Sequence, residues 1–150
     1  MTYQYTDGGR VEAGFKSLGD CGIRAVAVAC EMSYQDARKL LKEYANKGRQ
    51  GSRAISHGIY KNDMDAALRS IGWQWNQAPK FKGRKARYSD IPGRAILRMA
   101  KHFSVVIDGT LYDSWDSSHK MVYGYWSKRM SRKQPNSTKP KDGLITGETK

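Results

Sequence analysis

The spacing of apolar positions separates a helical first half of the chain from a strand-like second half. Residues 20–30 are apolar almost all round, which predicts a central, buried helix that begins near Asp20. The Asp20 carboxylate is expected to cap the free N–H groups of its first turn. Amphipathic spacing predicts a second helix over residues 33–48, which opens on a capping-box-like Ser-Tyr-Gln-Asp sequence, and a third over about 62–70.

The second half of the chain has the alternation and turn signals of a sheet. An Asp-Gly pair at 108–109 predicts a two-residue hairpin turn. Residues 1–19 are expected to form an irregular arm, and residues 80–87 form a basic loop. Helices followed by strands indicate an α+β fold whose N-terminal helices pack on a C-terminal antiparallel sheet. Strands are expected at 73–75, 94–99, 102–107, 110–115 and 121–126.

Composition indicates one globular domain over residues 1–126. Residues 127–150 hold seven Lys or Arg against Asp142 and Glu148, with little to bury, and are predicted to be a basic, disordered tail. The N-terminus lacks the pattern of a signal peptide, and no apolar run is long enough to span a membrane, so a cytoplasmic protein is expected. The net charge of +13 permits nucleic acid, an anionic polymer or an acidic protein as partner.

The two cysteines occupy different environments on the first helix. Cys21 and Cys30 are nine residues apart, and at about 100° per residue they point to opposite sides, so they do not form a disulfide. The three histidines at 57, 102 and 119 lack metal-ligand spacing, and neither a metal nor a cofactor is expected. A helix start favours the thiolate, which makes Cys21 a candidate nucleophile, whereas Cys30 is assigned to packing.

A thiol nucleophile also needs a histidine base and a group that orients it. Across the two-residue turn, strand register pairs His102 with Trp115 and Ser104 with Asp113. Side chains alternate along a strand, so Asp113 lies diagonally across from His102 on the same face. Asp116 points away unless the strand has already ended. Register therefore favours Asp113 as the orienting carboxylate.

This order of Cys, His and Asp resembles that of the papain-like cysteine peptidases. The portion from His102 onward looks closest to their bacteriocin-processing branch. The fuller pattern is similar to an uncharacterised group of small phage and bacterial proteins, which would place the chain in a host cytoplasm. The resemblance implies a papain-like fold with Cys21, His102 and Asp113 as nucleophile, base and orienter. It is carried by Asp7-Gly8-Gly9-Arg10, Ala13-Gly14-Phe15-Lys16, Gly19-Asp20-Cys21, Arg24-Ala25, His102, Val105-Val106-Ile107-Asp108-Gly109, Asp113 and Val122-Tyr123-Gly124-Tyr125-Trp126.

The chain departs from that family at the oxyanion donor. Papain-like peptidases place a glutamine a few residues before the nucleophile, where this chain has Phe15. Either Gln4 or a backbone N–H, for example beside Gly22, supplies the donor, or the activity is altered or lost. Asp20 is a further residue expected near the site.

Two further residues are candidates for substrate contact. Arg24, one helical turn after Cys21, either favours the thiolate, binds a substrate carboxylate or forms an ion pair. Trp115 lies on the His102 face of the hairpin. The basic loop at 80–87 would favour acidic substrates if it borders the cleft.

Two functions of different classes follow from these residues. The first is a cysteine hydrolase that cleaves a peptide or isopeptide-type amide, with peptidoglycan as a lower-ranked substrate. The alternative is a catalytically degenerate fold that binds a host protein or nucleic acid through its basic surface. The activation of the Cys21 thiol discriminates between them.

Overall fold

The computed structural model describes residues 2–16, 19–45 and 58–128. Within these ranges the chain forms three α-helices, a six-stranded sheet and one 3-10 turn, η2 (Tyr88–Asp90). The α+β class predicted from the sequence is therefore confirmed. The helices are α1 (Cys21–Ala29), α2 (Tyr34–Tyr44) and α3 (Lys61–Ser70), and the strands are β1 (Thr2–Tyr5), β2 (Trp73–Gln77), β3 (Arg94–Met99), β4 (His102–Ile107), β5 (Thr110–Asp113) and β6 (Val122–Lys128).

The sheet is mixed, with strand order β1-β5-β4-β3-β6-β2. Every neighbouring pair is antiparallel except β1 and β5, which run parallel. The expectation of a purely antiparallel sheet and an irregular N-terminal arm was therefore wrong for residues 2–5. β1 is short and three of its four side chains are exposed, so it lacks the apolar alternation that marks a half-buried strand.

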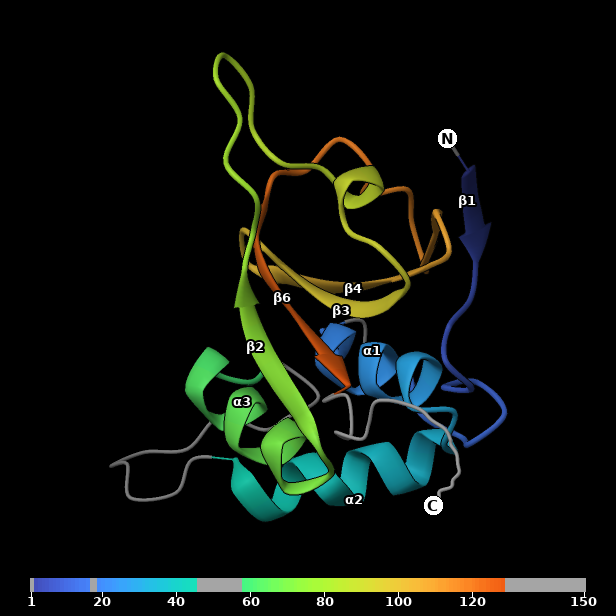
Figure 1. Cartoon of the computed structure of the whole chain (residues 1–150). Helices are drawn as coiled ribbons and strands as arrows, with labels where there is room; N and C mark the ends of the chain where they lie inside the picture. Colours follow the sequence, from blue (N-terminus) through green and yellow to red (C-terminus); the bar gives the residue numbers. More distant parts are fainter. Residues whose placement is uncertain (1, 17–18, 46–57, 129–150) are drawn as a thin grey trace, which may run out of the picture.

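The sheet lies between the helices and the long segment that connects β2 to β3 (Figure 1). On the helical side, α1 packs mainly on β4, and Ile23 and Val26 are fully buried there with Ile96 and Trp126. On the other side, residues 86–91 cover a second cluster. Its buried members are Ala86, Tyr88, Ile91, Ala95, Leu97, Met99, Val106, Leu111 and Val122. Both faces of the central strands are thus buried, and the strands form a rigid base for the site.

The β4–β5 hairpin has the predicted register. Val105 faces Tyr112, and Ile107 faces Thr110. Asp108 and Gly109 form the turn with φ of 48° and 87°, the positive values that a two-residue hairpin turn matched to strand twist requires. The register fixes which residues of β5 approach the start of β4.

Several boundaries differ from those expected. α1 begins at Cys21, and the Asp20 side chain makes no capping hydrogen bond because its carboxylate contacts other side chains. β5 ends at Asp113, and β6 continues to Lys128, two residues beyond the predicted domain boundary. The Ser33 hydroxyl accepts from the Asp36 N–H at 3.0 Å, which confirms the predicted cap of α2.

The predicted extension of the second helix to about residue 48 was wrong, because α2 ends at Tyr44 and Ala45 has an extended backbone. The predicted state of the tail from residue 129 onward concerns residues outside the described part of the chain. Among the described residues, no helix has both the length and the apolar content required to cross a membrane.

Candidate active site

Cys21 opens α1 and faces a cleft of about 690 Å³. Its side chain is half-buried, so the sulfur is shielded from bulk water yet reachable from the cleft. The cleft is bordered by residues 58–61, by the β3–β4 hairpin with His102, and by Trp115. The next residue, Gly22, allows the start of α1 to pack closely on Ile59, because a Cβ at position 22 would lie 2.8 Å from Cγ2 of Ile59.

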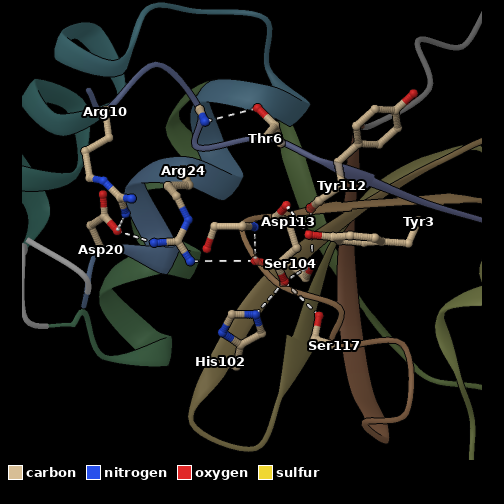
Figure 2. Close-up of polar contacts among 12 residues, drawn as sticks. Tyr3, Thr6, Arg10, Asp20, Arg24, His102, Ser104, Tyr112, Asp113 and Ser117 are labelled. Atoms are coloured by element: carbon tan, nitrogen blue, oxygen red, sulfur yellow. Dashed lines mark hydrogen bonds and ion pairs between the residues drawn. The ribbon is translucent and has the colours of Figure 1, made fainter. Parts of the chain in front are cut away.

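His102 is held by the carboxylate of Asp113. The distance from His102 Nε2 to Asp113 Oδ2 is 2.6 Å, and the two residues are 6% and 4% exposed. The same oxygen accepts the hydroxyl hydrogens of Ser104 and Ser117, each at 2.7 Å (Figure 2). Oδ1 accepts the backbone N–H of Ser114 at 2.7 Å. Asp113 is therefore fully hydrogen-bonded as an anion and fixed in orientation, which leaves Nδ1 of His102 for Cys21.

The Cys21 thiol and the His102 ring form a hydrogen bond. The pKa of the thiol is lowered and the pKa of the imidazole is raised. Burial by itself raises the pKa of Cys21, but the hydrogen bond and positive charge of His102, the backbone N–H of Phe103 and the charge of Arg24 outweigh it and lower the pKa. Burial by itself lowers the pKa of His102, but hydrogen bonds to Asp113 and Cys21 and their charges raise it to about 9. Both shifts favour the pair of thiolate and imidazolium over the pair of neutral groups.

Asp113 and Cys30 show how the surroundings determine these values. Burial opposes ionisation of Asp113, yet its bonds to His102, Ser104 and Ser117 keep the pKa of this carboxyl below its usual value. Cys30 lies at the other end of the same helix, and burial raises its pKa to about 11. The pKa values of the two thiols of this helix are thus shifted in opposite directions.

A buried charge network continues from Asp113 behind the helix start (Figure 2). Nη2 of Arg24 lies 3.6 Å from Oδ1 of Asp113, and Nη1 of Arg24 is hydrogen-bonded to Asp20. The fully buried Asp20 also accepts from Arg10 at 3.2 Å and from the Tyr34 hydroxyl at 2.6 Å. Two of the three roles considered for Arg24 are found in this geometry. Arg24 forms an ion pair with Asp20, and its charge helps to lower the pKa of Cys21.

Arg10 and Tyr34 were not identified from the sequence. They come from the N-terminal arm and from the start of α2, and no spacing rule connects these segments to Asp20. The pair of Asp20 and Arg24 did carry a signal, since the two residues are four positions apart, the separation of helical ion pairs.

Trp115 lies against the His102 ring at the mouth of the cleft. The ring centroids are 4.8 Å apart, and Trp115 remains 41% exposed. The exposed His119 also lies near Trp115, with ring centroids 6.1 Å apart. Trp115 therefore packs on the His102 ring and offers an apolar surface to a bound molecule.

The candidate oxyanion donors lie in different places. Gln4 is exposed on β1, where its amide donates to the Tyr5 carbonyl at 3.2 Å, and it does not border the cleft. Phe15 packs on the Tyr34 ring, with centroids 5.2 Å apart. Asp20 is a buried acceptor rather than a donor. The backbone N–H of Cys21 remains as a donor at the nucleophile itself, because the first N–H groups of a helix have no acceptor within that helix.

Across the described ranges, no group of three or more His, Cys, Asp or Glu side chains is arranged to hold a metal ion. His57, one of the three histidines of the chain, lies outside these ranges.

The comparison of the chain with protein-family models, with curated proteins and with solved structures finds no match. Function is accordingly inferred from the geometry of the site.

Proposed function

We propose that this chain is a cysteine hydrolase of the papain-like type that cleaves a peptide or isopeptide-type amide. The observation that carries the proposal is the relay from Cys21 through His102 to the buried Asp113, with a short hydrogen bond between the last two. A nucleophile, a base and a group that orients the base are the three parts of nucleophilic acyl transfer.

In the acylation step, the Cys21 thiolate attacks the carbonyl carbon of the amide. The new S–C bond places negative charge on the carbonyl oxygen, close to the helix start, where the N–H of Cys21 is available to stabilise it. When the C–N bond breaks, the His102 imidazolium gives its proton to the departing amine. A thioester on Cys21 and a neutral imidazole remain.

In the deacylation step, a water molecule enters from the cleft and His102 takes its proton as the oxygen attacks the thioester. The S–C bond breaks, the carboxylic acid leaves, and the thiolate–imidazolium pair is restored. Asp113 keeps its charge throughout and holds the imidazole in one orientation, which is the function of the third member in such triads.

The alternative of a basic binding protein without catalysis receives less support from the site. A fold that only binds has no need for a thiol of lowered pKa on the wall of a cleft, beside a histidine held by a buried carboxylate. The net charge of +13 fits either function.

The proposal is tested by alkylation with iodoacetamide at pH 6.5, with mass spectrometry to resolve the two cysteines. We expect rapid modification of Cys21, slow modification of Cys30, and loss of the difference in His102→Ala. Equal, slow labelling of both thiols in the native protein would contradict the proposal. Turnover is then measured with a mixed peptide-amide library, for which Cys21→Ala is the inactive control.

A further inference from the structure

We propose that the cleft selects substrates that carry a carboxylate close to the scissile amide, either on an acidic side chain or at a chain terminus. This inference rests on the proposed hydrolase function and adds a substrate class to it. It follows from three cationic side chains on the walls of the cleft, Lys61, Arg98 and Lys101.

The three cations come from separate elements that converge on the site. Lys61 begins α3, Arg98 lies on β3, and Lys101 ends the β3–β4 turn directly before His102. The residues that border the cleft in the described part of the chain include no Asp or Glu. Two of the residues that border the cleft, Gly19 and Gly58, directly follow segments 17–18 and 46–57 of the chain. The sequence of these two segments contains no acidic residue either.

These three cations differ from several arginines elsewhere in the fold, which have an acidic partner. Arg69, Arg84 and Arg94 each pair with a carboxylate, at 2.9, 2.9 and 3.4 Å. Within the described ranges, neither Lys61 nor Arg98 has such a partner, and the same holds for Lys101. Their charge is left for a molecule that enters the cleft.

Two of the three cations are supported by aromatic rings rather than by anions. Nζ of Lys61 lies 4.1 Å from the ring centre of Trp75, and the Arg98 guanidinium lies 5.5 Å from that of Phe103. A ring face restrains a cation without cancelling its charge. Arg98 faces Phe103 across the β3–β4 pair, and the N–H of Phe103 bonds to Cys21, so this charge lies close to the nucleophile.

The cleft cations are not those that the sequence suggested. The basic loop at 80–87 does not border the cleft, and its Arg84 pairs with Asp90. Arg24 does border the cleft, but Asp20 and Asp113 already occupy its guanidinium. Recognition of a substrate carboxylate therefore falls to Lys61, Arg98 and Lys101.

The test compares iodoacetate with iodoacetamide, two alkylating agents of the same chemistry that differ in one negative charge. The measured quantity is the ratio of their rate constants at Cys21, at an ionic strength of about 0.1 M. We compare the native protein with the triple variant Lys61→Gln, Arg98→Gln, Lys101→Gln. Each of these solvent-accessible cations contributes a factor of about two to three, so the ratio is expected to fall roughly tenfold in the triple variant.

The matched control is the triple variant Lys80→Gln, Lys82→Gln, Lys85→Gln, which loses the same net charge on the exposed loop outside the cleft. Its ratio is expected to stay within about twofold of the native one, because screening weakens charges beyond about 10 Å. An unchanged ratio in the cleft variant, or an equal fall in the control, overturns the inference.

The outcome is separable from that of the hydrolase proposal. If Cys21 is not activated, the iodoacetamide rate at pH 6.5 is slow, and the hydrolase proposal fails. The ratio is then measured at pH 9, where an ordinary cysteine is largely ionised, and it still reports on the cleft cations.

Peptide chloromethyl ketones identify the source of the carboxylate. One probe carries a glutamate side chain, and a second carries a neutral glutamine with a free terminal carboxylate. Faster labelling by either, relative to a fully neutral probe, supports the inference and identifies the group recognised. Equal rates for all three probes refute it.

Discussion

Replacement of Asp113 by asparagine tests what holds the Cys21–His102 pair in its charged form. The Asp113 carboxylate lies 2.6 Å from His102 Nε2, and both residues are buried. At an effective dielectric constant of about 20, two unit charges about 3 to 4 Å apart attract by about 4 to 6 kcal/mol. Burial opposes this attraction, the hydrogen bond and charge of Cys21 add to it, and the net result is a pKa of His102 raised from 6.5 to about 9. That difference corresponds to roughly 3 kcal/mol in favour of the imidazolium.

Asparagine keeps the shape of the side chain but removes its charge. We expect the pKa of His102 to fall by about two units in Asp113→Asn, and the pKa of Cys21 to rise because the imidazolium is lost. The assay is the pH dependence of iodoacetamide alkylation at Cys21. In the native protein the rate reaches its plateau below the usual cysteine pKa of about 8.5. In the variant the profile moves to higher pH, and the rate at pH 6 falls about 100-fold.

Asp116→Asn is the matched control. Asp116 is three residues further along the chain and exposed, and it accepts the N–H of Ser118 at 3.0 Å. Its variant is expected to keep the native pH profile. A native profile in a folded Asp113→Asn, with folding checked by circular dichroism and urea denaturation, would show that the Asp113 charge does not hold the pair. An equal shift in Asp116→Asn would show a general charge effect and would also refute the reasoning.

Three further predictions concern stability and titration. Asp20→Asn removes the carboxylate beside the buried Arg10 and one of the two carboxylates beside the buried Arg24, so the free energy of unfolding in urea is expected to fall by about 3 kcal/mol. Gly124→Ala places a Cβ 2.2 Å from the indole of Trp75, and a loss of about 3 kcal/mol is expected in the same measurement. NMR should show His102 titrating with a pKa of about 9, and a lower pKa in Cys21→Ala, which lacks the thiolate. Because the folded pKa lies above 6.5, this ionisation stabilises the fold fully below pH 6.5, and the contribution is lost as pH rises through 9.

The parts of the site that were predicted from the sequence depend on local geometry. A two-residue turn fixes strand register, and register was sufficient to choose Asp113 over Asp116 as the partner of His102. The position of Cys21 at a helix start likewise follows from local pattern. The contact between Cys21 and His102 does not, since it joins two separate halves of the chain. It was expected only from the order of residues that resembles papain-like peptidases.

The features that escaped prediction depend on tertiary contacts. β1 is a strand because its backbone pairs with β5, while its exposed side chains carry no pattern. Asp20 was expected to cap α1, because Asp before an apolar run is the usual signal for an N-cap. Arg10 and Tyr34, which converge on it in the fold, compete for its oxygens. The cleft cations were missed because they are scattered along the sequence.

The packing of α1 against β4 also determines when the nucleophile becomes reactive. More than half of the chain lies between Cys21 and His102. During synthesis, Cys21 therefore emerges from the ribosome well before His102 does. Until the sheet has closed on the helix, Cys21 has no imidazolium beside it and reacts as an ordinary cysteine. Under the proposed function, a chain still on the ribosome therefore carries a thiol that is not yet activated. Under the proposed function, completion of folding is the step that activates the thiol.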